Sequence, residues 1–133
     1  MQYLNKSAEK VFHTLLGGLK KSGDAKKIDN TDGLFMPVHV EIIDHSKYGN
    51  HVSIAHYYEQ NGDLMKDPEM TFLDSLKGNV FPMTFEQDGG MPICQVAMEI
   101  DENDVIRRND KLLESLADFA NMWVKNIKDQ QRL

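Results

Sequence analysis

Apolar residues change their spacing twice along this chain, from a helical repeat to a two-residue repeat and back again. In the first segment they recur at intervals of three and four residues, and Ser7 is placed to cap the helix that they predict. This first stripe consists of Ala8, Val11, Phe12, Leu15, Leu16 and Leu19. A second stripe runs from 112 to 127, with Asn109 or Asn103 as its N-cap. An amphipathic helix is therefore expected on each side of the central segment.

Between the two helices, short runs alternate apolar and polar residues, which is typical of strands with one buried face. These runs cover 38–42, 52–59, 70–73, 81–86 and 93–98. Pro82 interrupts its run, which indicates an edge strand or a bulge. The segment 24–33 is polar and rich in turn-forming residues, so we interpret it as a connecting loop.

The connections between the runs are short, which favours antiparallel neighbours over crossover helices. The pattern therefore predicts an α+β fold, in which a sheet of about five antiparallel strands packs against an N-terminal and a C-terminal helix. A chain of 133 residues is long enough to bury one core, and no linker divides it. We expect residues 1–133 to form a single domain, with both helices on the same face of the sheet.

The cysteine count and the lack of long apolar runs bear on where in the cell the protein is found. The chain has 1 cysteine, which excludes an internal disulfide and fits a reducing environment. No apolar run approaches the roughly 18 residues that a membrane-spanning helix needs, and the first ten residues lack the apolar stretch of a signal peptide. We expect a cytoplasmic protein that does not associate with membranes.

Negative charge is concentrated in the middle of the chain. The net charge is −6, but residues 59–104 hold eleven acidic residues against two lysines, a local net charge of −9. Such a surface repels phosphate, so direct binding of nucleic acid is not expected. It is either a solvated sheet face or a functional surface that imitates nucleic acid or docks on a basic protein. The candidate acidic surface consists of Glu86, Asp88, Asp101 and Glu102.

The segment 55–74 concentrates residue types that carry chemistry. Asn61-Gly62 follows a strand and predicts a tight hairpin turn, and Asp67-Pro68 predicts a second turn. The candidate binding residues in and near this segment are His56, Tyr58, Glu59, Asn61, Asp63, Asp67, Glu69, Gln87 and Asp88. The alternative interpretation is structural: His56 is a half-buried histidine bonded to the turn, and Asp63 and Asp67 accept hydrogen bonds from loop amides.

Residues 56–65 read HYYEQNGDLM and are followed at 67–70 by DPEM. This spelling resembles the signature of a family of small domains of unknown function carried on bacterial plasmids, phages and conjugative elements. In that family a strand with a proline and then an aromatic-Gln-Asp stretch follow, as Phe81-Pro82 and 85–88 do here. The family's aromatic glycine turn is represented by 88–91, which reads DGGM. The resemblance covers roughly 38–98 and implies a genomic setting and a site, without implying a reaction.

Two kinds of catalysis could use residues of this chain. A metal-dependent hydrolase would combine His56 with carboxylates of 59–69, since imidazole and carboxylate together suit zinc, manganese or iron. On a regular strand, however, His56 and Glu59 point to opposite faces, and the spacing does not fit a calcium-binding loop. Cys94 lies among apolar residues, where a packing role is expected. The sequence therefore identifies no catalytic residue and leads us to expect no metal or cofactor.

The main hypothesis is a small acidic protein-binding module of a mobile genetic element. Its partner would be a host protein that handles nucleic acid or takes part in defence, and the module would inhibit or modulate it. The alternative is the metal-dependent hydrolase that uses the segment from His56 to Glu69. Homo-oligomerisation is left open.

Overall fold

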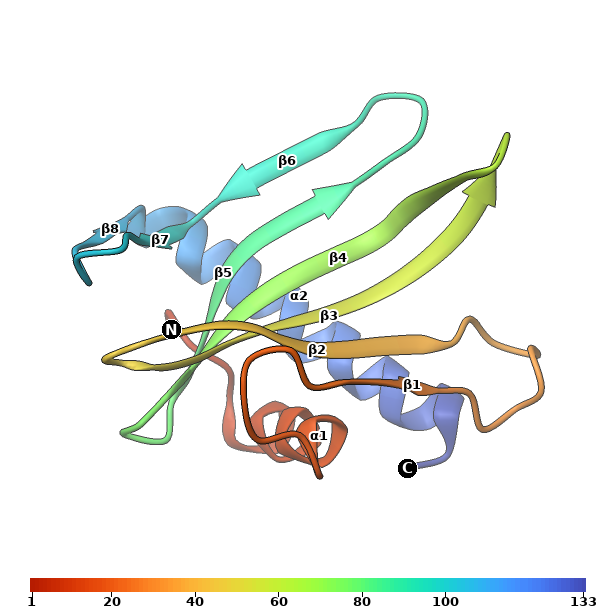
Figure 1. The fold of residues 1–133 in the computed structure, drawn as a ribbon, viewed down its shortest axis with the longest axis horizontal. Helices are drawn as coiled ribbons and strands as arrows, with labels where there is room; N and C mark the ends of the chain where they lie inside the picture. Colours follow the sequence, from red (N-terminus) through yellow and green to blue (C-terminus); the bar gives the residue numbers. More distant parts are fainter.

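The computed structural model describes residues 1–133, in which a meander of six antiparallel strands forms the main sheet (Figure 1). The helices are α1 (Lys6–Leu16) and α2 (Asp110–Gln131). The main sheet contains β1 (Ala25–Ile28), β2 (Val38–Ser46), β3 (Gly49–Gln60), β4 (Asp63–Ser75), β5 (Val80–Gln87) and β6 (Ile93–Val96), in this order. A small second sheet pairs β7 (Met98–Ile100) with β8 (Ile106–Arg108).

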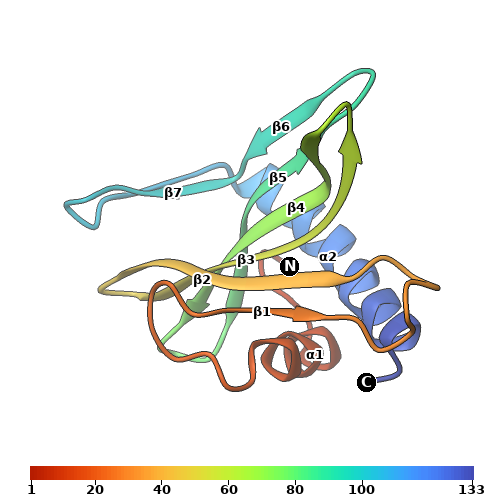
Figure 2. The ribbon, with the colours of Figure 1, turned by 45° about the vertical axis from the view of Figure 1, so that its right-hand side comes forward.

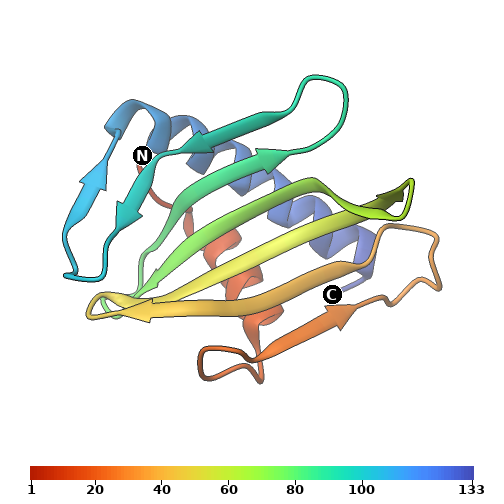
Figure 3. The ribbon, with the colours of Figure 1, turned by 45° about the horizontal axis from the view of Figure 1, so that its top comes forward.

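Both helices lie against the same face of the main sheet, which we call the helix face, and leave the other face, the open face, uncovered (Figure 3). Apolar residues of both helices and of β2 to β5, together with Leu4, Ala97 and Met98, form one core cluster of 24 buried residues. At its centre the rings of Phe12 and Phe72 meet edge to face, with their centroids 5.3 Å apart. The α+β prediction and the common helix face are confirmed.

The helix boundaries correct one of the expected caps. Asn5, and not Ser7, is the N-cap of α1, because the Asn5 side chain accepts a hydrogen bond from the backbone N–H of Ala8. Ser7 lies inside the helix and donates its hydroxyl hydrogen to Asn5 Oδ1. Asn109 caps α2 as predicted, by accepting from the N–H of Leu112. Neither helix is both long enough and apolar enough to cross a membrane.

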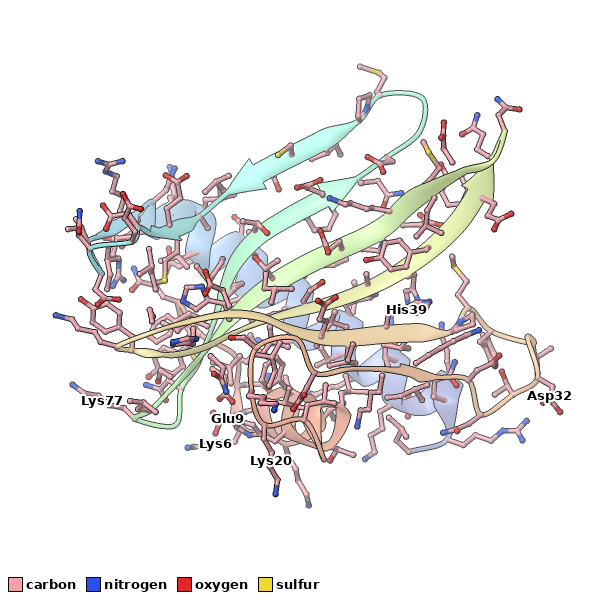
Figure 4. All side chains as sticks on the ribbon, in the orientation of Figure 1. Lys6, Glu9, Lys20, Asp32, His39 and Lys77 are labelled. Carbon is pink, nitrogen blue, oxygen red and sulfur yellow. The ribbon has the colours of Figure 1, made fainter.

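The expected loop at 24–33 was wrong in part, because it contains β1. This strand is an edge of the sheet, and it pairs with β2 in the register that sets Lys26 opposite Val40. Its lysines concealed it in the sequence, since an edge strand with no buried residue shows little apolar alternation. Figure 4 shows Asp32 on the loop that connects β1 to β2.

The long β3–β4 hairpin also differs from the prediction at one end. Asn61 and Gly62 form the expected turn, and both have positive φ angles of 53° and 84°. The second turn predicted at Asp67-Pro68 was wrong. These residues lie inside β4, at a bulge where the two of them stand opposite His56 alone. A proline can be accommodated there because the ladder is already interrupted at a bulge.

The remaining strands follow the prediction with smaller differences. The register between β4 and β5 shifts at Met83, so the bulge expected near Pro82 is confirmed. The run predicted at 93–98 is divided at Ala97 into β6 and β7, and the chain then forms the unpredicted β7–β8 hairpin. This hairpin extends away from the body of the protein in Figure 2.

We expect Gly49→Ala to lower the free energy of unfolding by about 2–3 kcal/mol. Gly49 has φ 145°, and a Cβ atom at this position would lie 2.1 Å from the backbone oxygen of Asp74. Gly90→Ala is the matched control, because a Cβ there meets no atom within 4 Å. Urea denaturation of both variants measures the difference, and equal stabilities would contradict this account of the β3–β4 contact.

The stability of the fold should fall on mild acidification partly because of His51. This side chain is buried and bonded to Ser46 Oγ at 3.0 Å. Burial lowers the pKa of His51, and the Asp44 carboxylate acts in the opposite direction. Below about pH 6.5 the unfolded chain therefore takes up a proton that the folded chain resists, so stability is lost as the pH falls towards the folded pKa.

In urea denaturation at pH 7.5 and 5.5, His51→Gln should lose less stability between the two pH values than the unsubstituted protein. Carboxylates that titrate in this range affect both proteins alike, so the difference between the two losses isolates His51. If both proteins lose the same free energy of unfolding between the two pH values, His51 does not contribute.

Candidate functional site around the β3–β4 bulge

The bulge distributes the polar residues of the β3–β4 hairpin over both faces of the sheet. Ala55 pairs with Glu69, and the next pair joins Tyr57 to Lys66. Lys66 and Glu69 are three residues apart and would point to opposite faces of a regular strand. With the extra residue in β4 they point to the same face, where Lys66 Nζ lies 3.1 Å from Glu69 Oε1.

His56 lies on the helix face and is buried, with 6% of its surface exposed. Its Nδ1 donates a hydrogen bond to the carbonyl oxygen of Pro37 over 3.0 Å. Because a carbonyl oxygen can only accept, Nδ1 carries the proton, and in the neutral ring Nε2 is an acceptor. The ring also meets Trp123 of α2 edge to face, with centroids 5.7 Å apart. His56 is thus bonded to the segment before β2, not to the hairpin turn.

Asp67 and Gln87 come together on this same face. Gln87 Nε2 donates to Asp67 Oδ1 over 2.6 Å and so connects the end of β5 to the bulge. His56, Asp67 and Trp123 all line an open pocket of about 320 Å³ between the sheet and α2. The structure therefore unites three of the nine candidate binding residues: His56, Asp67 and Gln87.

On the open face, Lys66 is the centre of a charged network. Its Nζ lies 2.7 Å from Glu86 Oε2 in addition to its contact with Glu69, and Ser53 Oγ donates to Glu69 Oε2 over 2.7 Å. The hydrogen bond to Glu86 raises the pKa of Lys66 most strongly, and Glu69 adds to this, while burial opposes it. Lys66 therefore stays charged, and its network holds β3, β4 and β5 together.

Two aromatic residues lie beside this network. Tyr57 forms an edge-to-face contact with His39 of β2, with ring centroids 5.0 Å apart. Figure 4 labels His39 on β2. Burial raises the pKa of Tyr57, and the nearby Glu69 carboxylate raises it further. Burial lowers the pKa of His39, and the nearby Lys27 and His56 lower it slightly further. Both side chains are therefore neutral near pH 7.

Asp88 and Tyr58 fix the end of β5 against the hairpin. The Asp88 carboxylate accepts from the backbone N–H of Lys66 over 2.9 Å, and the Asp88 N–H donates to the Lys66 carbonyl oxygen over 3.0 Å. A Cβ atom on Gly89 would lie 2.8 Å from the Tyr58 hydroxyl. The loop after β5 is thus in close contact with the hairpin.

Glu59, Asn61 and Asp63 do not join either cluster. They lie exposed at the tip of the hairpin, and their side chains make no hydrogen bond within the chain. The interpretation that Asp63 accepts hydrogen bonds from loop amides is not supported by these contacts.

The four residues of the candidate acidic surface do not form one patch. Glu86 and Asp88 are both engaged with Lys66 near the end of β5. Asp101 and Glu102 lie in the turn between β7 and β8, at the other end of the protein in Figures 1 and 2. The Asp101 carboxylate accepts from the backbone N–H groups of Asn103 and Val105. Three of the four carboxylates therefore already have partners within the chain.

Two further observations bear on catalysis. No three His, Cys, Asp or Glu side chains lie together in a way that could hold a metal ion. The expectation that Cys94 is packed among apolar residues was wrong, because β6 lies at the edge of the sheet and all four of its residues are exposed. The sequence concealed this exposure because an apolar strand can be either central or peripheral.

The exposed edge at β6 is a surface that sequence reasoning missed. Ile93 and Val96 expose 47% and 44% of their surface. A signal was present in the sequence, since no charged residue occurs between Gly89 and Met98. The pocket wall formed by Phe35 and Trp123 was also missed, because it depends on how the loop before β2 lies against α2.

Comparison with known proteins gives one match. Residues 7–133 match the family described as a domain of unknown function (DUF6908), and the chain belongs to this family. No curated protein and no solved structure matches the chain.

We expect Asp67→Ala to lower the free energy of unfolding by about 1–2 kcal/mol, since it leaves the half-buried Gln87 amide with only a long contact of 3.4 Å to the Asp88 carbonyl oxygen. Asp63→Ala should change stability by less than about 0.5 kcal/mol, because the exposed Asp63 carboxylate makes no such bond. Thermal and urea denaturation compare the two variants. Equal effects would mean that the bond between Asp67 and Gln87 does not stabilise the bulge.

Proposed function

We propose that this member of the family is a protein-binding module that adds an extended segment of another protein to β6. The observation that carries the proposal is the state of this strand, whose four residues are all exposed and uncharged at the edge of the sheet. No other element lies along its outer side in Figures 1 and 2. An edge of this kind presents unpaired backbone groups that pair with a further strand.

The pairing of β6 with β5 indicates which of its backbone groups face outward. Ala97 N–H donates to the Met83 carbonyl oxygen, one position beyond the pair formed by Thr84 and Val96. Since bonded and non-bonded pairs alternate in an antiparallel ladder, Gln95 is directed towards β5. The N–H and C=O groups of Cys94 and Val96 are then directed away from the sheet, where a partner strand can reach them.

The opposite edge of the sheet, β1, is protected against pairing with another chain. β1 carries two lysines, Lys26 and Lys27, and Lys26 Nζ donates to the carbonyl oxygen of Gly17 over 2.7 Å. Edge strands bearing lysine discourage pairing with other chains, because each added strand must desolvate the charge. β6 has no such device, which supports it as the binding edge.

Charge supports a basic partner. Glu86 lies directly opposite Cys94 in the β5–β6 pairing and shares its charge with Lys66, and the segment 59–104, spread over both ends of the sheet, has a net charge of −9. An extended segment with alternating apolar and basic residues would place its apolar side chains on the face of Ile93 and its basic side chains on the opposite face, where Glu86 stands opposite Cys94.

The resemblance of 56–70 to a signature found on plasmids, phages and conjugative elements supports a setting in a mobile genetic element. On this proposal the protein acts in the cytoplasm, and its partner is a host protein that handles nucleic acid or takes part in defence. The module would inhibit or modulate that partner. A module of this type needs no reaction of its own.

Cys94→Pro tests the edge directly, because proline removes an N–H that faces outward and leaves the β5 ladder intact. Cys94→Thr is the matched control, since it removes the thiol but keeps the N–H and favours a strand. Affinity capture from a host lysate should return the same partner with the unsubstituted protein and Cys94→Thr. Cys94→Pro should lose that partner while its melting temperature stays close to that of Cys94→Thr.

Capture of the same partner by Cys94→Pro would contradict the proposal.

Raising the salt concentration should also slow association, because steering between exposed charges is screened over about 8–10 Å at physiological ionic strength. Size-exclusion chromatography over a range of protein concentrations distinguishes a second copy of this chain from a different partner.

A further inference from the structure

The pocket beside His56 and Asp67 is built from four separate parts of the chain. It lies between the loop before β2, His56 of β3, the bulge of β4 and the face of α2 that carries Trp123. Besides His56, Asp67 and Trp123, its lining includes Phe35, Met36 and Asn126.

Hydrogen bonds to Gln131, at the end of α2, hold the loop in position. The Gln131 side chain is buried; its Oε1 accepts from Asn30 N–H over 2.8 Å, and its Nε2 donates to the Met36 carbonyl oxygen over 3.1 Å. The Asn30 amide in turn donates to the Gln131 carbonyl oxygen over 3.0 Å. The outer wall of the pocket is therefore anchored at both ends of the segment 30–36.

The polar groups in the pocket favour a cation. Asp67 Oδ1 accepts a hydrogen bond from Gln87, and Asp67 Oδ2 makes no hydrogen bond within the chain. The Nδ1 of His56 is already committed to Pro37, so Nε2 of the neutral ring can only accept. No lysine or arginine lines the pocket to neutralise the Asp67 carboxylate. The Asp67 carboxylate would repel an anion here, whereas a cation with several N–H groups could donate hydrogen bonds to Asp67 and His56.

The walls favour a planar cation on an apolar stem. Phe35 and Trp123 contribute aromatic surface, and Met36 contributes a flexible apolar one. A guanidinium group stacks on aromatic rings, bonds to carboxylates through its edge and is less strongly hydrated than an ammonium group. We propose that this pocket binds a guanidinium group carried on an aliphatic stem. The proposal goes beyond the pairing of β6 and does not rest on it.

The chain supplies its own reporter for this pocket. Trp123 is the only tryptophan, so its fluorescence responds to occupancy of the pocket without interference from another indole. N-butylguanidine is the probe, and N-butylurea is a neutral molecule of the same shape. The guanidinium should change the Trp123 emission in a saturable way, and the urea should bind roughly ten- to hundredfold more weakly, because charge-assisted hydrogen bonds are the stronger ones.

Asp67→Asn should weaken binding of N-butylguanidine by a similar roughly ten- to hundredfold, since it removes the charge but keeps an oxygen for Gln87 to bond. Asp63→Asn is the matched control, as it removes an equal charge from the exposed start of β4, and it should bind like the unsubstituted protein. Titration with the pentapeptide Gly-Gly-Arg-Gly-Gly distinguishes the two sources of the group. Tighter binding of the peptide assigns the pocket to an arginine side chain, and tighter binding of N-butylguanidine assigns it to a free molecule.

Equal binding of N-butylguanidine and N-butylurea would overturn the proposal, and so would the absence of any saturable change. This comparison uses the unsubstituted protein, so it decides the matter even if Asp67→Asn proves unstable. Equal weakening by Asp67→Asn and Asp63→Asn would also overturn it, because the attraction would then be a general effect of the acidic surface.

Discussion

The extra residue in β4 determines which side chains of the hairpin reach which face of the sheet. Without it Lys66 would point towards the helices, where a charged side chain would have to be buried at high cost. With it Lys66 reaches the open face and meets Glu69 and Glu86, while Asp67 remains beside His56. One local irregularity thus separates a charged network from a pocket. Both clusters depend on the same backbone feature.

Periodicity predicted the parts of the fold that are large and buried on one side. The stripes of α1 and α2 and the alternation in β2, β3 and β5 follow directly from burial against a common core. β1 could not be recognised in this way, because its lysines face solvent at an edge and only tertiary pairing with β2 makes it a strand. Local preference predicts a turn at Asp67-Pro68, but the pairs that Lys66 and Glu69 form with β3 on either side keep these two residues within β4.

The candidate site was predictable as a segment but not as an arrangement. Concentration of polar residue types identified 56–69 and 87–88, and the structure joins His56 to Asp67 and Asp67 to Gln87. The partners Pro37, Trp123 and Gln131 come from distant parts of the chain, and no spacing in the sequence connects them to the bulge. The acidic residues show the opposite relation between sequence and space: Glu86 and Asp101 belong to the same acidic segment of the sequence but lie at different ends of the protein.

The topology of the sheet has a consequence for how the chain acquires its structure during synthesis. Each strand of the main sheet pairs with its neighbour in sequence, so the hairpins can form in order as the chain emerges. Before 110–131 is available, only α1 can cover the apolar helix face, because α2 supplies eight of the buried residues that close it. A partly synthesised chain is therefore a sheet whose apolar face is covered in part only, the state most open to aggregation or capture by a chaperone.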